Sequence, residues 1–164
     1  MIKPYNILFL SSGSACRSQI ARGWCNWYGR PLYDVQSAGI SASGVDEAAI
    51  TVMKEIGIDI SCQNPEAVTE DMLKFADIVV ILCPVADEQY PSLPAGVRRE
   101  FWSLACPAIT DTMSEHDRLQ AYRCLRDDIK TRVIDLIARL NTLHYQSFQP
   151  FPRPVASLET AGIA

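Results

Sequence analysis

Hydrophobic positions follow two different spacings along this chain. Nearly continuous apolar runs occupy 5–11 and 77–82, and shorter strand-like runs occupy 33–38 and, more weakly, 97–102. Apolar runs without polar interruption are typical of strands that are buried on both faces of a sheet. Between these runs the apolar residues recur every three or four positions, which is the spacing of helices with one buried face.

Four stretches carry the helical spacing, and most of them have recognisable ends. They cover 18–28, 45–56, 69–76 and a long final stretch whose apolar positions run from Leu119 to Leu140. Gly57 is placed to end the second helix, and Thr69 is placed to cap the start of the third. Ser114 with Asp117 resembles a capping box at the start of the last helix.

The alternation of strands and helices predicts an α/β fold. We expect a three-layer sandwich in which a four-stranded parallel sheet is flanked by helices on both faces. One domain covers 1–143, and a Pro-rich tail without helical period covers 144–164. Ligands of such sheets bind at the carboxyl ends of the strands, which is where residues 11–18 are expected.

Composition narrows the classes of function. The 164 residues are 48% hydrophobic and 21% charged, with a net charge of −4, so nucleic acid is not expected as a partner. The first apolar run is too short to span a bilayer and lacks the pattern of a signal peptide, which predicts a cytoplasmic protein without a membrane partner. None of the six cysteines forms a C-x-x-C pair, so neither a metal nor another cofactor is expected.

The most informative segment lies between the first strand and the first helix. It reads Ser-Ser-Gly-Ser-Ala-Cys-Arg-Ser over 11–18. Small residues at a helix start direct several backbone N–H groups toward one point, and an arginine guanidinium can hold two oxygens of an anion at once. The segment therefore predicts a site for a tetrahedral oxyanion such as phosphate, arsenate or sulfate. Its expected binding residues are Ser11, Ser12, Gly13, Ser14, Ala15, Cys16, Arg17 and Ser18.

The amino-acid sequence around this loop resembles that of a known family. Residues 7–24, from Ile-Leu-Phe-Leu through Cys-Arg-Ser to Arg-Gly-Trp, are similar to the start of the thioredoxin-linked arsenate reductases, a branch of the low-molecular-weight protein tyrosine phosphatase superfamily. Further matching stretches follow in the same order at 37–39, 55–61, 76–83, 99–102 and 126–129. The resemblance covers about residues 5–142 and implies a low-molecular-weight phosphatase-like fold.

The resemblance also implies roles for three residues of the loop. In that family a cysteine opens the loop as the nucleophile, an arginine clamps the oxyanion, and the next serine supports the thiolate. Arg17 and Ser18 match, whereas Ser11 stands in the nucleophile position. A serine hydroxyl titrates far above neutral pH and this loop holds no histidine, so Ser11 should bind an oxyanion but attack it poorly. Cys16, beside Arg17, is interpreted as a buried residue that supports the loop.

Two other family positions also depart from the pattern. The family's general acid belongs to an Asp-Pro pair, but this chain has Cys106 before Pro107, and Asp111 is only a weak substitute. Cys83 matches the first of two relay thiols, with a possible redox role, or it is a core residue. Tyr90 occupies the second relay position, and Cys62 is an unproven replacement. A thioredoxin-type reductant is therefore a doubtful partner.

Three hypotheses follow from the residues. The first is a catalytically degenerate member of the family, a pseudoenzyme that binds an oxyanion without turnover. The second is an active arsenate reductase or protein tyrosine phosphatase, in which Ser11 is an engineered replacement of cysteine or an unconventional thiol is used. The third is a protein-binding scaffold that uses the tail or the Trp27-Tyr28 end of the first helix, although these aromatics are interpreted as core residues.

Overall fold

A computed structural model shows the fold of the chain, and it describes residues 4–29, 31–90 and 92–147. The elements in chain order are β1 (Tyr5–Ser11), α1 (Arg17–Gly29), β2 (Tyr33–Gly39), α2 (Glu47–Lys54), α3 (Glu70–Phe75), β3 (Ile78–Ile81), α4 (Pro84–Gln89), β4 (Arg98–Phe101) and α5 (Glu115–Ser147). All four expected strands and all four expected helices are present. The short helix α4 was not expected, because its six residues show no helical period and, unlike α3, it has no capping side chain at its start.

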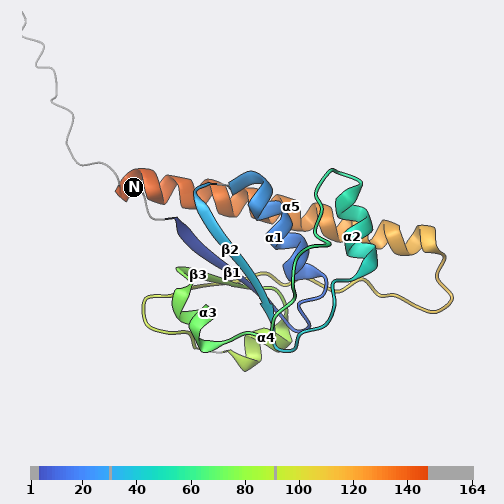
Figure 1. The fold of residues 1–164 in the computed structure, drawn as a ribbon, viewed down its shortest axis with the longest axis horizontal. Coiled ribbons are helices and arrows are strands. Elements are labelled where there is room, and N and C mark those ends of the chain that lie inside the picture. The colour runs from blue at the N-terminus through green and yellow to red at the C-terminus, as the bar shows by residue number, and fades with distance from the viewer. Residues whose placement is uncertain (1–3, 30, 91, 148–164) are drawn as a thin grey trace, which may run out of the picture.

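The four strands form one parallel sheet in the order β2-β1-β3-β4 (Figure 1). Ser11 pairs with Gly39 at the end of β2, and Ile81 of β3 pairs with Phe101 of β4. The carboxyl ends of all four strands therefore meet along one edge of the sheet, and the loop after β1 lies at the centre of that edge.

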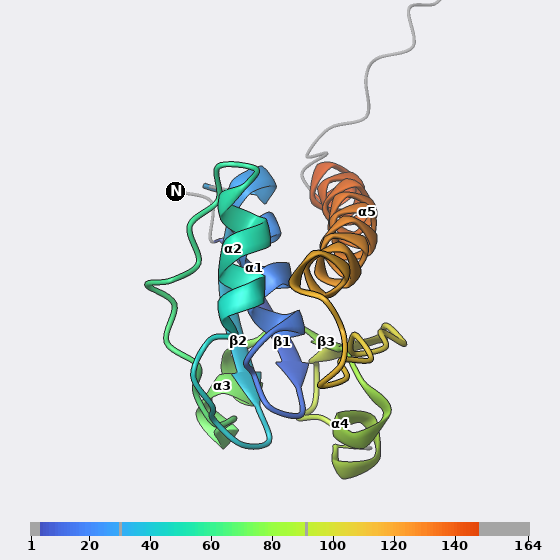
Figure 2. The same ribbon diagram turned by 90° about the vertical axis from the view of Figure 1, so that its right-hand side faces the viewer.

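Two separate hydrophobic cores cover the two faces of the sheet. Ile7 and Phe9 of β1 point into the core formed with α1, α2 and α5, whereas Leu8 and Leu10 point into the core that includes Leu73 of α3. This alternation follows from the two-residue period of a strand. Figure 2 shows α1, α2 and α5 on one side and α3 and α4 on the other. The three-layer α/β sandwich is confirmed.

The expected helix ends are present. Thr69 Oγ accepts a hydrogen bond from Met72 N at 3.2 Å, and Ser114 Oγ accepts one from Asp117 N at 3.1 Å. Gly57 has a φ of +83° and ends the turn after α2. A left-handed residue closes the last turn of a helix there, and glycine adopts that conformation without steric strain.

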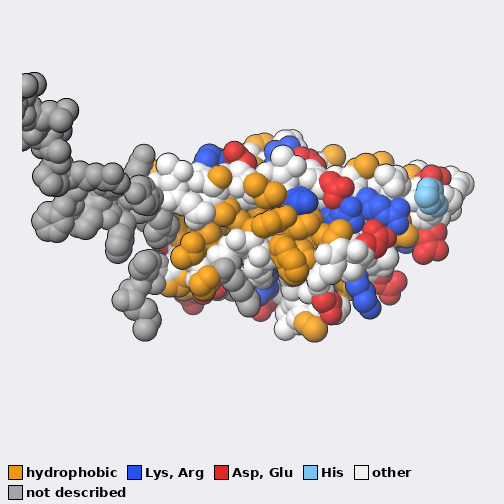
Figure 3. Space-filling model, turned by 90° about the horizontal axis from the view of Figure 1, so that it is seen from above, with side chains coloured by type: hydrophobic (Ala, Val, Ile, Leu, Met, Phe, Trp, Pro, Cys, Tyr) orange, Lys and Arg blue, Asp and Glu red, His pale blue; other side chains and the backbone are white. Residues whose placement is uncertain are grey.

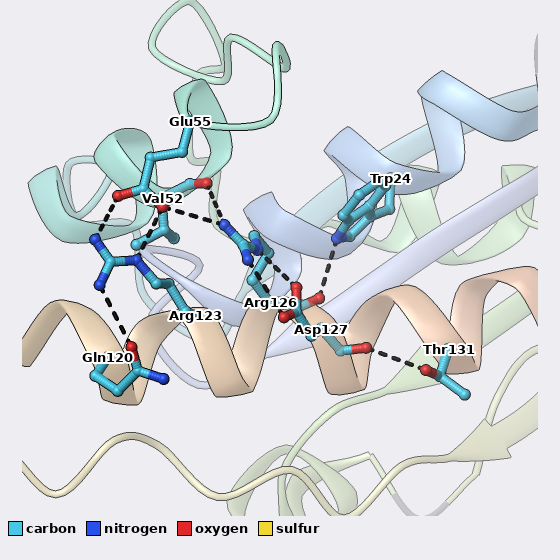
Figure 4. A network of polar contacts seen from close by, with 8 residues as sticks. All are labelled: Trp24, Val52, Glu55, Gln120, Arg123, Arg126, Asp127 and Thr131. Atoms are coloured by element: carbon cyan, nitrogen blue, oxygen red, sulfur yellow. Dashed lines mark hydrogen bonds and ion pairs between the residues drawn. The ribbon is translucent and has the colours of Figure 1, made fainter.

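The last helix docks on α1 and α2 through a buried arginine (Figure 4). Arg126 donates to the Val52 carbonyl at 2.9 Å and to Glu55 at 3.3 Å, and Glu55 also binds Arg123 at 2.7 Å. The Trp24 indole donates to the Arg126 carbonyl at 3.1 Å. The stretch 126–129, which carried part of the family resemblance, thus holds α5 against the helical layer.

The aromatic end of α1 differs from the expectation. Trp27 is 60% exposed and Tyr28 is 43% exposed, so their interpretation as core residues is wrong. The buried stripe of α1 runs through Ile20, Trp24 and Cys25, and Trp27 falls outside it. Tyr28 stacks on the Trp24 ring, with 5.6 Å between ring centroids, and leaves its other side uncovered.

The helical part of the chain extends beyond the expected domain boundary. Helix α5 continues to Ser147, so the first residues of the expected tail are helical, and 148–164 lie outside the described residues. Among the described helices, none is long and apolar enough to cross a membrane. On the face seen in Figure 3, hydrophobic side chains gather in the middle and charged side chains of both signs surround them.

Candidate oxyanion site

The loop between β1 and α1 turns sharply at the carboxyl edge of the sheet. Ser11 is the last residue of β1 and is only 2% exposed, and Arg17 is the first residue of α1. Ser14, at the middle of the loop, has a φ of +49° and is also buried. A left-handed residue here reverses the chain, so the loop curls over the start of α1.

Every carbonyl of the loop from residue 11 to residue 16 already has a hydrogen-bond partner. The carbonyls of Ser11, Ser12, Gly13, Ser14, Ala15 and Cys16 accept, in that order, from Ile40 N at 3.1 Å, Ser41 N at 3.1 Å, Ser43 Oγ at 2.8 Å, Gln19 Nε2 at 2.9 Å, Asp46 N at 3.0 Å and Ile20 N at 2.9 Å. Four of these partners belong to 40–46, the segment between β2 and α2. Because these carbonyls are already paired, the N–H groups of the loop other than that of Ser14, which donates to Ser11 Oγ at 3.2 Å, are the main-chain groups that a ligand could engage.

Gly39 lets the two segments approach this closely. A Cβ atom at this position would lie 2.5 Å from Ser41 O, 2.6 Å from Ser14 N and 2.9 Å from the Gly13 carbonyl carbon. All three are backbone atoms, which cannot move aside by changing a rotamer. A side chain at position 39 is therefore incompatible with this loop geometry.

Three hydroxyl groups form a buried cluster beneath the loop. Ser11 Oγ accepts from Ser14 N at 3.2 Å and donates to Ser18 Oγ at 3.2 Å, and the hydroxyls of Ser14 and Ser18 lie 3.3 Å apart. Gln19 Nε2 also donates to Ser14 Oγ at 3.0 Å. The contacts of the Ser11 hydroxyl are thus an amide and another hydroxyl, neither of which is a base that could take its proton.

Arg17 reaches from the start of α1 across the loop. Its side chain is 9% exposed, and it donates to the Leu104 carbonyl at 2.8 Å and to Ser12 Oγ at 3.2 Å. Leu104 belongs to the segment that follows β4, so three strand ends contribute to the surroundings of the loop. The guanidinium has five N–H donors, and these two contacts leave further donors for a ligand.

Cys16 does not behave as a reactive thiol. Burial, together with the negative charge of Asp46 and the neighbouring Cys106, raises its pKa to about 12, although Arg17 acts in the opposite direction. The residue is partly buried against the core that α1, α2 and α5 form, rather than fully buried as expected. A thiol with this pKa is almost entirely protonated at neutral pH and is a poor nucleophile.

The expected relay and acid residues occupy three different places in the fold. Cys83 is 2% exposed and packs in the core of the opposite face, where Tyr90 packs against the same cluster. Cys62 is exposed and lines a cleft with Trp27. Asp111 is exposed in the turn before α5. In the described parts of the chain, no group of three or more His, Cys, Asp or Glu residues is arranged to hold a metal ion.

Sequence reasoning missed the segment 40–46 and its most important side chain. Asp46 caps α2 by accepting from Ala48 N at 2.8 Å, and its other carboxylate oxygen accepts from the Tyr122 hydroxyl at 2.9 Å. Its own N–H holds the Ala15 carbonyl. An aspartate before a helix is a recognisable capping signal, but its contacts with the loop and with α5 depend on the tertiary fold.

The fold and this strand–loop–helix unit define a class of α/β proteins with a loop of small residues at the carboxyl edge of a parallel sheet. The family follows from comparison with known proteins. Residues 6–146 match the family model described as low molecular weight phosphotyrosine protein phosphatase, and the chain belongs to that family.

Arsenate reductases are among the curated relatives of this chain. The chain is 41% identical over 127 residues to an arsenate reductase from Halalkalibacterium halodurans, and 40% identical over 127 residues to one from Bacillus subtilis. Each alignment covers 77% of this chain and 91% of the relative. The chain is therefore similar to arsenate reductases along nearly their whole length.

Solved structures agree on the fold. An arsenate reductase in the phosphate binding state superimposes with a TM-score of 0.64 at 32% identity, covering 82% of this chain and 98% of that one. The YwlE arginine phosphatase from Geobacillus stearothermophilus gives a TM-score of 0.72 at 24% identity, covering 87% of this chain and 97% of that one. The expected low-molecular-weight phosphatase-like fold is thereby confirmed.

Proposed function

We propose that this protein binds a tetrahedral oxyanion in the loop 11–18 and does not turn it over. The observation that carries the proposal is the pairing of six consecutive loop carbonyls, four of them by the segment 40–46. This pairing leaves the loop N–H groups, apart from that of Ser14, available to a ligand at the start of α1, where the helix macrodipole also favours a negative charge. Arg17 adds a full positive charge beside these groups.

The chemistry of the loop points to phosphate, arsenate or sulfate. The N–H groups of the loop and one guanidinium offer donors on several sides, and these match an anion with oxygens in every direction. Support comes from the arsenate reductase that was solved in its phosphate binding state and is 32% identical to this chain. The loop residues 11–18 are the proposed ligand set, with Arg17 as the charged clamp.

Absence of turnover follows from the groups around the ligand position. The Ser11 hydroxyl is bonded to Ser14 and Ser18, so no base is in contact to make it a nucleophile. Cys106 replaces the carboxylic acid that would protonate a leaving group. Cys83, the candidate redox residue, is enclosed in the opposite core beside Tyr90. The nucleophilic attack and the protonation of the leaving group therefore each lack a suitable residue, and the thiol relay lacks its second thiol at Tyr90.

Calorimetric titration with phosphate, arsenate and sulfate tests the binding. Charge-assisted hydrogen bonds are worth about 1.5–3 kcal/mol each, so Arg17→Ala should weaken binding by at least about tenfold. Arg132→Ala removes the same charge from an exposed i,i+4 pair on α5 and should leave the affinity unchanged. Equal affinity of the wild type and Arg17→Ala would contradict the proposal.

Activity as an arsenate reductase is the second candidate, because relatives of that description are about 40% identical to this chain. Reduction of arsenate by the unaltered chain, with consumption of a thiol reductant, would establish it and overturn the proposed lack of turnover. Ser11→Cys separates the two cases further. If only this variant is active, the nucleophile is the one essential group that is missing. If neither chain is active, the losses extend beyond Ser11.

A further inference from the structure

Two cysteines that the proposed function does not use lie at one surface hollow. Cys106 belongs to the irregular segment after β4, and Cys124 lies in the third turn of α5. Both are exposed, and both line a hollow of about 380 Å³ together with Ala105, Leu125 and Asp128. Segments that are distant in sequence therefore bring two accessible thiols to the same site.

We propose that Cys106 and Cys124 form a redox pair that a hydroperoxide converts to an intramolecular disulfide. One thiolate attacks the peroxide oxygen, so the O–O bond breaks and a sulfenic acid forms as hydroxide or an alkoxide leaves and takes up a proton. The second thiolate then attacks that sulfur, an S–S bond forms and water leaves. The two thiols lose two electrons and two protons in total, and the peroxide is reduced. A dithiol reductant reverses the reaction by thiol–disulfide exchange.

The other thiols are less suited to pair with Cys106. Cys16 is close enough to Cys106 for the two to interact electrostatically, but burial holds the pKa of Cys16 at about 12. Since the thiolate is the attacking form, Cys16 is nearly inert at neutral pH. Cys25 is buried, Cys83 is buried in the opposite core, and Cys62 lies in a different cleft. Cys124 is the accessible thiol that shares a surface hollow with Cys106.

The backbone around Cys106 can adjust to the bond. A disulfide needs Cα atoms within about 7 Å of each other, with Cβ atoms that face one another. Cys124 is fixed on the 33-residue helix α5, whereas 102–110 form neither helix nor strand. Any adjustment on forming the bond would therefore fall on the residues around Cys106, downstream of the anchored Leu104, rather than on α5, which is docked through Arg126.

The same segment links the thiol pair to the oxyanion loop. Leu104, two residues before Cys106, accepts the 2.8 Å hydrogen bond from Arg17. The segment is anchored just upstream, where Trp102 N donates to Ile81 O at 2.8 Å. Drawing Cys106 toward α5 consequently strains the hydrogen bond at the Leu104 carbonyl and disturbs the position of the Arg17 guanidinium. This link between the thiol pair and the loop rests on the proposed function. If it holds, the oxidised protein binds phosphate about tenfold more weakly than the reduced protein.

Hydrogen peroxide titration of the folded protein, followed by thiol counting and peptide mass mapping, tests the pair. The expected product is one crosslinked peptide pair containing Cys106 and Cys124, which dithiothreitol returns to two free thiols. Cys106→Ser and Cys124→Ser should each abolish it, and Cys62→Ser should not. A different crosslink, or oxidation of either thiol to sulfinic acid without a crosslink, would overturn the proposal.

Phosphate titration of the reduced and oxidised proteins tests the link to the loop. Weaker binding after oxidation, with no such change in Cys124→Ser, supports it. Equal affinity of the two forms overturns the link and leaves the disulfide, which is measured separately by mass. Absence of phosphate binding in the reduced protein overturns the proposed function, while the crosslink still decides the redox pair.

Discussion

Substitution of Gly39 by alanine is the sharpest test of how the oxyanion loop is held. The new Cβ would lie 2.5 Å from Ser41 O, 2.6 Å from Ser14 N and 2.9 Å from the Gly13 carbonyl carbon. Contacts under 3.0 Å to backbone atoms force one of the two segments to move. The loop and the segment 40–46 would therefore separate, and the carbonyl pairing between them would be strained.

Gly39 itself cannot retreat to relieve the overlap. Its N–H donates to Glu66 O at 2.9 Å and its carbonyl accepts from Val68 N at 2.8 Å, while the strand pairs with β1 on its other edge. Overpacking in well-packed interiors costs about 1–3 kcal/mol. Because three fixed backbone atoms are hit at once, we expect about 3 kcal/mol of lost stability, together with loss of oxyanion binding.

Urea denaturation with and without saturating phosphate measures both effects. The wild type should gain stability from phosphate, by about 2.7 kcal/mol at a concentration one hundred times the dissociation constant. Gly39→Ala should unfold earlier and gain little. Gly44→Ala is the matched control, because it lies in the same segment and its Cβ would meet nothing within 4 Å. Wild-type stability and a wild-type phosphate response in Gly39→Ala would refute this account of the loop.

Three further predictions concern stability. Arg126→Met should lower the free energy of unfolding by about 1–3 kcal/mol, because the buried Val52 carbonyl loses its donor. Arg132→Ala removes an exposed i,i+4 pair and should change it by less than about 0.5 kcal/mol in urea denaturation. Similar losses in both variants would contradict the docking role. Burial raises the pKa of Glu100, but the hydrogen bonds it accepts, first that from Arg139, lower the pKa by more than burial raises it. The folded-state pKa therefore lies below the ordinary value. The unfolded chain then binds more protons, so the stabilisation that ionised Glu100 contributes is present above about pH 4.3 and is lost as pH falls through the folded-state pKa. The denaturation midpoints of Glu100→Gln should therefore depend less on acid pH than those of the wild type. An unaltered pH profile of the midpoints would contradict this. Gly57→Ala should cost about 1 kcal/mol through its φ of +83° alone, since no atom lies within 4 Å of the new Cβ, and a thermal melt equal to that of the wild type would disprove the strain.

Local signals were sufficient for the framework of the fold. The uninterrupted apolar run of β1 identified a central strand, and Thr69 and Ser114 marked helix starts through hydrogen bonds to their own neighbours. Such features depend on residues within one turn or one strand. The sequence alone therefore predicted the parallel sheet, the helices α1, α2, α3 and α5, and the position of the loop at the edge of the sheet.

Features that depend on distant segments were not predictable. The role of Gly39 arises from atoms of residues 13, 14 and 41, and the contacts of Asp46 reach Ala15 and Tyr122. Trp27 and Tyr28 follow the buried Trp24 at the spacing of one helix face, yet both are exposed. Periodicity does not show which part of a helix the other elements cover. The surface hollow that Cys106 and Cys124 both line likewise depends on how α5 packs beside the segment after β4.

The pairing of the loop carbonyls means that different groups carry binding and reactivity in this loop. The groups that would hold the anion are main-chain amides, which every residue except proline supplies, and they are oriented by folding before any ligand arrives. The nucleophile, by contrast, is a single side chain at Ser11. Substitution at that position can remove reactivity and leave recognition intact. Such a loop can therefore bind an oxyanion whether or not it reacts with it, and Ser11→Cys tests whether the nucleophile alone separates the two cases.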